Sequence, residues 1–235
     1  MKFCCHCGNT LERRVPVGDD RSRDTCGGCG AIHYENPRAV VGTLIERDGK
    51  LLLCRRAIEP ARGRWTPPSG FLELGESSPA GALRETREEA CAEAAIDGLF
   101  CHIDLPHIGQ SYLFYRARLV GDAVAAGPES LEVAWFNAHA LPFDELAFPV
   151  IHVALELWMQ DRADGRDRLH HGLLQWDGHG PRFDATSYRL EEHIAHDVVR
   201  SALRPGGAGP GGAGPGGGAG GGAGGGAQSR DRSSG

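Results

Sequence analysis

The sequence predicts an α/β protein preceded by a small metal-binding segment. Two observations predict the α/β class: apolar, partly β-branched runs typical of strands are interspersed with segments in which apolar residues recur at helical spacing. A third observation, two C-x2-C pairs near the N-terminus, predicts the metal-binding segment. The chain of 235 residues has a formal net charge of −6. This acidic balance argues against a general nucleic-acid binder, because phosphate backbones attract clustered Lys and Arg.

Four cysteines near the N-terminus are spaced like the ligands of a zinc ion. Each C-x2-C pair places two thiolates on one tight turn, and 18 residues separate the two pairs. Four sulfur ligands make a closed tetrahedral site that suits structural Zn²⁺ and leaves no open position for catalysis. Two disulfides are the alternative, although a secreted disulfide framework normally uses all its cysteines. We therefore expect Zn²⁺ to be held by Cys4, Cys7, Cys26 and Cys29.

Strands and helices are expected throughout the next part of the chain. Asp48-Gly49 is a strong hairpin turn between two strand-like runs, at residues 39–45 and 50–54. Apolar residues recur at i, i+3, i+4 and i+7 in the helix expected at 150–159. The other expected strands are 96–105, 112–120 and 131–136, and the expected helices are 78–91, 150–159 and a further one near 190–202.

Residues 70–89 carry the strongest functional signal. Ser78 is the expected N-cap of the first helix. Glu85, Glu88 and Glu89 then fall within about 100° on one helix face, where three carboxylates repel one another unless a cation lies between them. Mg²⁺ binds carboxylate oxygens together with the phosphate oxygens of a substrate. A solvated acidic face is the alternative on composition alone.

The spacing G-x5-E-x7-R-E-x2-E-E, which begins at Gly70, resembles the signature of the Nudix hydrolases, enzymes that cut diphosphates linked to another moiety. Every charged position of the signature is matched, so the resemblance is specific. It implies an α/β/α sandwich with a mixed sheet. It also implies metal ligands at Glu85, Glu88, Glu89 and the Ser69 carbonyl, one of the glutamates as general base, and Arg84 as the residue that orients Glu88.

The sequence departs from the family pattern at the end of this helix. Thr86 and Ala92 stand where the family prefers bulky aliphatic residues, and Cys91 replaces a glycine that closes the helix in a left-handed conformation. A side chain in that conformation costs about 1 kcal/mol. These departures bear on stability more than on chemistry.

Further site residues are expected outside the signature. The resemblance implies that Glu132 reaches the metal site, with a surface glutamate at a strand edge as the alternative. A net-acidic protein must supply local positive charge for a diphosphate, so Arg55, Arg56 and Arg64 are candidate phosphate contacts, although each also fits an ordinary surface charge. Candidates for stacking on adenine or flavin rings, with core packing as the alternative, are Trp65, Tyr112 and Phe114.

The four-cysteine ribbon and further segments resemble the plant and bacterial zinc-ribbon Nudix group, whose plant members hydrolyse FAD and ADP-ribose. The similarity runs from Phe3 to Glu192 and includes residues 32–37, 52–56, 63–66, 127–132 and 141–148. It implies Mg²⁺- or Mn²⁺-dependent cleavage of FAD to FMN and AMP, or of ADP-ribose to AMP and ribose 5-phosphate.

Two alternatives to this activity follow from the sequence. A pyrophosphatase for NADH or another nucleoside-diphosphate-linked compound is the first, but the NADH-cleaving ribbon group carries S-Q-P-W-P-F-P-x-S after the signature. Residues 91–110 contain no such element. A non-catalytic, nucleotide-sensing module is the second.

The expected organisation has four parts: a zinc ribbon at 1–36, a Nudix domain at 37–162, a C-terminal extension at 163–203 and a disordered Gly/Ala/Pro-rich tail at 204–235. The expected partner is a small-molecule dinucleotide or nucleoside diphosphate, not nucleic acid or a membrane, and homodimerisation stays open. Cys4 follows Met1 too closely for a targeting peptide to fit. The expected location is therefore cytoplasmic, or plastid if an N-terminal extension is missing.

Overall fold

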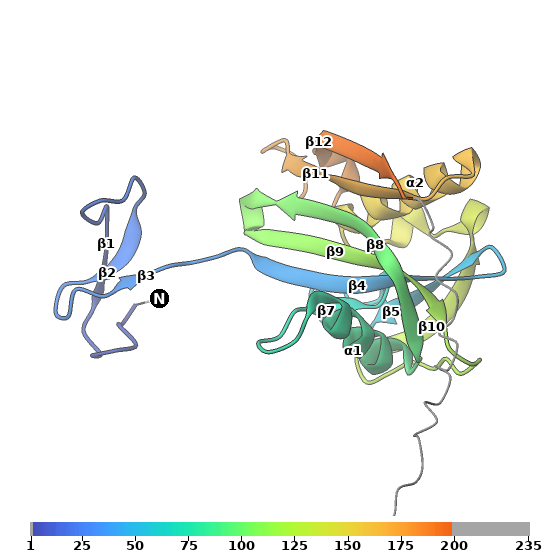
Figure 1. Ribbon diagram of the computed structural model, residues 1–235, viewed down its shortest axis with the longest axis horizontal. Helices are drawn as coiled ribbons and strands as arrows, with labels where there is room; N and C mark the ends of the chain where they lie inside the picture. Colours follow the sequence, from blue (N-terminus) through green and yellow to red (C-terminus); the bar gives the residue numbers. More distant parts are fainter. Residues whose placement is uncertain (1, 199–235) are drawn as a thin grey trace, which may run out of the picture. The chain divides into compact units, whose positions relative to one another are not determined.

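The computed structural model describes residues 2–198, which form a three-stranded sheet, a larger mixed sheet and two α-helices (Figure 1). The predicted tail at 204–235 lies outside the described residues. None of the described helices is long and apolar enough to cross a membrane. The small sheet has the antiparallel order β1-β2-β3, with β1 at Leu11–Arg14, β2 at Arg23–Cys26 and β3 at Ile32–His33.

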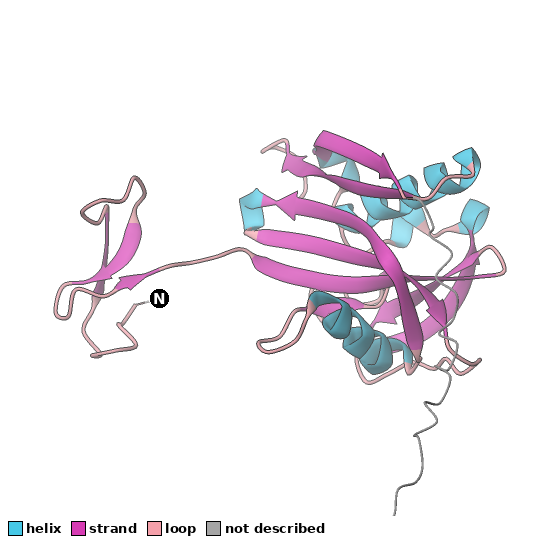
Figure 2. Cartoon of the chain, viewed as in Figure 1, coloured by secondary structure: helices cyan, strands magenta, loops and turns pink. Residues whose placement is uncertain are grey.

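The larger sheet has the strand order β10-β5-β4-β9-β8-β11-β12. The β4–β9 and β8–β11 pairs are parallel, whereas the β4–β5, β5–β10, β8–β9 and β11–β12 pairs are antiparallel, so the sheet is mixed as predicted. Figure 2 shows these strands in magenta and the helices that lie against them in cyan. The bounds are β4 Arg38–Arg47, β5 Lys50–Arg56, β8 Ala94–Leu105, β9 Gln110–Leu119, β10 Ser130–Asn137, β11 Arg168–Trp176 and β12 Tyr188–Asp197, with β6 Trp65–Thr66 on β5 and β7 Ser69–Phe71 on β4.

Two helices cover opposite faces of this sheet. The helices are α1 at Ser78–Ala90 and α2 at Pro149–Asp164, and short 3₁₀ turns are η1 Pro106–Ile108, η2 Ala138–Ala140, η3 Phe143–Glu145 and η4 Ala185–Ser187. Neighbouring residues of β4 point to opposite faces: Val40 packs in the cluster of α2, and Val41 packs with Ala82 of α1. The sandwich predicted from the sequence is therefore confirmed.

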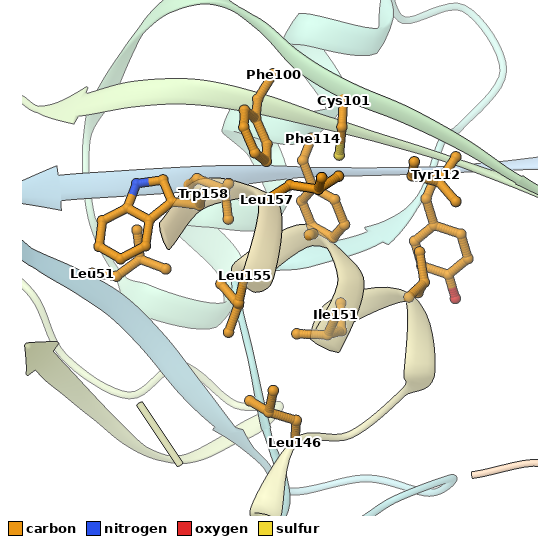
Figure 3. Packing of buried hydrophobic residues seen from close by; sticks show 14 of the residues in the cluster. Leu51, Phe100, Cys101, Tyr112, Phe114, Leu146, Ile151, Leu155, Leu157 and Trp158 are labelled. Atoms are coloured by element: carbon orange, nitrogen blue, oxygen red, sulfur yellow. The ribbon is translucent and has the colours of Figure 1, made fainter. Parts of the chain in front are cut away.

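The cluster around α2 is the larger core. Figure 3 shows Ile151, Leu155 and Trp158 of α2 among side chains contributed by the strands, including Phe100 and Phe114. All five side chains are at most 3% exposed. The three aromatic residues considered for ring stacking, Trp65, Tyr112 and Phe114, belong to this same core cluster.

The predicted hairpin is confirmed, and one predicted helix is wrong. Asp48 and Gly49 have φ angles of 51° and 74°, the left-handed pair that a tight two-residue hairpin requires. The helix expected near 190–202 is not formed in the part of that range that the structure describes, because residues 188–197 form β12 along the edge of β11. Tyr188 and Leu190 pack against the core, and Arg189 between them is exposed, so this segment follows the period of a strand.

The first turn of α1 differs from prediction by one residue. Ser77, not Ser78, is the N-cap, and its side chain accepts a hydrogen bond from the Ala80 N–H. The Ser78 hydroxyl instead forms a 2.6 Å hydrogen bond with the Tyr115 hydroxyl. At the other end Cys91 adopts the left-handed conformation expected of the glycine it replaces, with φ 47° and ψ 35°.

A buried aspartate ties the C-terminal strands to the rest of this fold. Asp161, near the end of α2, accepts hydrogen bonds from Arg116 Nη2 of β9 at 2.6 Å and from Arg168 Nε of β11 at 2.7 Å. His170 Nε2 lies 3.1 Å from the same carboxylate, and burial lowers the pKa of His170. The strands of the predicted C-terminal extension are therefore bonded to α2 and β9.

Thr86 has a buried polar partner that accounts for a hydroxyl at this position. Its Oγ1 donates to the Ala82 carbonyl at 2.8 Å and lies 2.7 Å from Thr43 Oγ1 of β4. Both threonines are fully buried. Because Thr86 uses its proton on Ala82, the Thr43 hydroxyl donates to Thr86.

Thr86→Val is expected to lower the free energy of unfolding by about 1–3 kcal/mol, because it strands the buried Thr43 hydroxyl without this partner. Adding Thr43→Val removes the stranded group, so the double variant is expected to be more stable than Thr86→Val alone. Chemical denaturation of both variants measures the difference. A double variant less stable than the single one would contradict the pairing.

Candidate active site

Arg84 organises the acidic face of α1. Its Nη1 donates to Glu85 Oε1 at 2.7 Å and to Glu88 Oε2 at 2.9 Å, and its Nε and Nη2 bind both carboxylate oxygens of Glu76. Nη2 also donates to the Phe71 carbonyl at 3.0 Å. Arg84 thus makes the contact with Glu88 that its expected role requires. The guanidinium lowers the pKa of Glu76 and holds the loop before α1 against the helix.

Glu85 and Glu89 are the buried members of this acidic face. Glu89 is only 4% exposed, and its Oε2 accepts the Ser69 N–H at 2.9 Å. Burial raises the pKa of Glu89 to about 8, and burial also raises the pKa of Glu85. The charge of Glu85 also raises the pKa of Glu89, and the charge of Glu88 raises the pKa of Glu85. Glu88 differs, because its side chain is 56% exposed.

Gly70 leaves the space that the Glu85 carboxylate occupies. A Cβ atom on Gly70 would lie 2.5 Å from Glu85 Cδ, well inside van der Waals contact. Gly70 belongs to β7, which pairs with β4 through Val41. The glycine of the signature therefore permits a close approach between this strand and α1.

Glu85, Glu89, Ser69 and Gly70 line one cavity of about 620 Å³. Its volume lies in the range of small-molecule sites. The lining also includes Arg56, which is 9% exposed and has its guanidinium carbon 5.2 Å from the centre of the Phe148 ring. Buried carboxylates and a buried cation thus share one cavity.

The other two candidate arginines lie outside the lining of this cavity. Arg55 donates to the Gly63 carbonyl and forms an ion pair with Glu132 at 3.6 Å. Arg64 donates to the carbonyls of Asp144 and Leu146. Two arginines that the sequence did not single out, Arg38 and Arg182, line the cavity instead. Neither has a local sequence signal, because the tertiary fold alone brings them there.

The structure brings Glu129, rather than Glu132, to the cavity lining. Glu129 precedes β10, and its charge raises the pKa of both Glu85 and Glu89. Glu132 lies in β10 opposite Arg55 of β5, and its side chain is 53% exposed. The one sequence signal for Glu129 was its place three residues before Glu132.

The four N-terminal cysteines form a separate cluster. Their Sγ atoms all lie within 4.8 Å of one another, with Cys7–Cys26 at 3.4 Å and Cys4–Cys29 at 3.7 Å. Tetrahedral Zn–S bonds of about 2.3 Å place sulfurs about 3.8 Å apart, so these four sulfurs fit Zn²⁺. All eight cysteines are free thiols, so the disulfide alternative is not seen.

Comparison with known proteins identifies the family. The family model described as NUDIX domain matches residues 35–154, a little over half of the chain. The chain belongs to the Nudix family. A second model, described as Nudix N-terminal and named for its zinc ribbon, matches residues 2–35 of this Nudix protein.

The Nudix chain is similar to proteins whose names specify several different activities. A solved NUDIX hydrolase from Nitrosomonas europaea is 44% identical, with a TM-score of 0.71, and the match covers 74% of this chain and 98% of that one. Among curated relatives, the NAD-capped RNA hydrolase NudC of Stutzerimonas stutzeri (strain A1501) is 27% identical over 68% of this chain. The ADP-ribose pyrophosphatase of Methanocaldococcus jannaschii is 29% identical over 49%. The chain spans 57% and 69% of the lengths of these two relatives.

The cavity carboxylates fit a divalent cation of the Mg²⁺ or Mn²⁺ type. The donors gathered there are hard carboxylate oxygens from Glu85, Glu89 and Glu129, the type that these ions prefer. Burial is the main cause of the raised pKa values of Glu85 and Glu89, and the charge of Glu129 raises both further. A bound cation would supply the missing positive charge.

Gly70→Ala is expected to displace the Glu85 carboxylate, because the new methyl group takes its space. The rate of diphosphate hydrolysis should fall about tenfold or more. The melting temperature should change little, because the end of a flexible side chain can move aside. Gly98→Ala is the matched control, since its Cβ meets nothing within 4 Å. Equal activity of the two variants would rule out this role for Gly70.

For the cysteine cluster, metal analysis of the purified protein is expected to find about one Zn²⁺ per chain, and a chelator should lower the melting temperature by removing it. Cys26→Ser should lose the zinc. Cys5→Ser should retain it, because Cys5 is exposed and lies outside the cluster. Zinc-free protein with an unchanged melting temperature would contradict a structural zinc.

Proposed function

We propose that the chain is a metal-dependent Nudix pyrophosphatase that hydrolyses the diphosphate of FAD, of ADP-ribose, or of both. Cleavage would give FMN and AMP from FAD, and AMP and ribose 5-phosphate from ADP-ribose. The observation that carries the proposal is the pair of buried carboxylates, Glu85 and Glu89, in one cavity with the buried Arg56. The relative named as an ADP-ribose pyrophosphatase supports the same substrate class.

Each part of the cavity has a task in this reaction. Glu85, Glu88, Glu89 and the Ser69 carbonyl would hold Mg²⁺ or Mn²⁺, which would supply the positive charge that neutralises a diphosphate and the Lewis acidity that activates a water molecule. Arg84 keeps Glu85 and Glu88 in place through its two short hydrogen bonds. Arg56, already fixed by its bond to the Pro60 carbonyl, would bind a phosphate oxygen of the substrate.

Glu129 is the better-placed candidate for the additional acidic residue. Its charge acts on Glu85 and Glu89 across the cavity, whereas the charge of Glu132 faces Arg55. A catalytic role for Glu132, as first expected from the sequence, would require this ion pair to open. Comparing the kcat/KM of Glu129→Gln with that of Glu132→Gln tests which of the two glutamates has the catalytic role.

A pyrophosphatase for NADH or an NAD-linked substrate is the second candidate. The NudC relative, whose name specifies NAD-capped RNA, favours it. The missing S-Q-P-W-P-F-P-x-S element favours FAD or ADP-ribose instead. The acidic net charge predicts that nucleic acid is not a partner, and this stays a prediction. A non-catalytic sensor is disfavoured because every carboxylate of the signature is present.

The decisive experiment is a parallel assay of Mg²⁺-dependent AMP release from FAD, ADP-ribose and NADH. Zinc-loaded wild-type protein should release AMP from FAD or ADP-ribose with a higher kcat/KM than from NADH. Glu89→Gln should lower kcat/KM at least about tenfold, because it removes a ligand charge while keeping the shape of the side chain.

Glu93→Gln is the matched control for this assay. Glu93 follows the same helix, is exposed and pairs with Arg87 on the surface. Its variant should keep wild-type turnover. AMP release from none of the three substrates would overturn the proposed function, and normal turnover of Glu89→Gln would overturn the metal assignment.

A further inference from the structure

Large apolar side chains remain exposed around the cavity that holds the catalytic candidates. Four of the described residues of this kind line it: Ile58 at 39% exposed, Phe71 at 48%, Ile108 at 38% and Phe183 at 57%. They come from four separate places in the chain, after β5, in β7, in η1 and between β11 and β12. Exposed apolar surface gathered at one cavity marks a ligand-binding surface.

Phe183, the most exposed of the four, belongs to the loop at 177–187. This loop joins β11 to β12 and lies beyond residues 35–154, which match the NUDIX domain. The centre of the Phe183 ring is 6.2 Å from the centre of the Phe148 ring at the start of α2. A largely exposed aromatic ring contributes little to the core, so its position at the cavity needs another explanation.

The loop that carries Phe183 is held in place by hydrogen bonds. Trp176 Nε1 donates to the Gly180 carbonyl at 3.1 Å, and the Tyr188 hydroxyl donates to the Arg182 carbonyl at 2.9 Å. Asp184 accepts from the Thr186 N–H and hydroxyl. The side chains of Arg182 and Phe183 are thus presented to the cavity from an ordered backbone.

Planar cations accompany the aromatic rings at this cavity. The guanidinium of Arg182 lies 5.2 Å from the Trp176 ring, and that of Arg38 lies 4.8 Å from the Phe71 ring. Aromatic rings and guanidinium planes together form flat surfaces on which a nucleotide ring stacks, and the cations also attract phosphate. The carboxylates and Arg56 account for the diphosphate, so the apolar surface is available for a different part of the same molecule.

We propose that the loop at 177–187 forms a ring subsite, in which Phe183 stacks on a planar heteroaromatic ring of the nucleotide whose diphosphate is cleaved. This inference rests on the proposed function and deepens it. It assigns a substrate-selecting task to a segment outside the matched NUDIX domain. Substrates that place a base or flavin ring on Phe183 are favoured over ring-free diphosphates.

Binding measurements on Phe183→Ala test the subsite without requiring turnover. The probes are FMN, followed by flavin fluorescence, AMP, followed by calorimetry, and inorganic pyrophosphate as a ring-free compound, all with Mg²⁺ present. Phe183→Ala should weaken binding of FMN, AMP or both about tenfold. Binding of pyrophosphate should stay within about twofold of wild type, because its contacts would be with Mg²⁺ at the carboxylates and with Arg56.

Ile194→Ala is the matched control, since Ile194 is 49% exposed on β12 and does not line the cavity. It should bind all three probes like wild type. The subsite is overturned if wild type binds neither FMN nor AMP, if Phe183→Ala leaves both affinities unchanged, or if it weakens pyrophosphate binding equally. Failure of the proposed function would appear separately, as absence of AMP release by wild-type protein that still binds a ring-bearing probe.

Discussion

The repulsion among carboxylates on one face of α1 is the constraint on which the site depends. Arg84 relieves part of it, because one guanidinium bonds Glu76, Glu85 and Glu88 together and also fixes the Phe71 carbonyl of the preceding strand. Arg84 does not bond Glu89, whose carboxylate is almost inaccessible to solvent and whose pKa is raised to about 8. Such a group next to further carboxylates fits the divalent-cation site proposed here.

The sandwich provides the geometry that keeps this arrangement together. β4 lies inside the sheet, packs α1 on one face and α2 on the other, and pairs with β7, which carries Gly70 beneath the Glu85 carboxylate. The C-terminal strand pair completes the opposite side of the cavity and is bonded to α2 and β9 through Asp161. The groups proposed to bind the metal, the phosphates and the ring therefore come from distant parts of the sequence but meet at one cavity.

Local signals were sufficient to predict much of this structure. The Asp48-Gly49 turn, the strands β4, β5, β8, β9 and β10, and the helices α1 and α2 depend on signals between neighbouring residues and were found from the sequence, whereas β11 was not. The N-cap was placed one residue late because two serines stand side by side, and only their hydrogen bonds, from the Ala80 N–H to Ser77 and between Ser78 and Tyr115, distinguish them. Predictions failed where tertiary pairing decides: β12 is a strand because β11 has an edge to pair. Arg38, Glu129 and Arg182 reach the cavity only through the fold.

Titration of the zinc-loaded protein with Mn²⁺, followed by electron paramagnetic resonance, tests most directly whether the buried carboxylates hold a divalent cation. Wild-type protein is expected to bind Mn²⁺ at the cavity, and a variant with both Glu85→Gln and Glu89→Gln is expected to lose that binding while keeping its fold and its zinc. Mn²⁺ binding that is unchanged in the folded double variant would contradict the assignment of these carboxylates as the catalytic metal site.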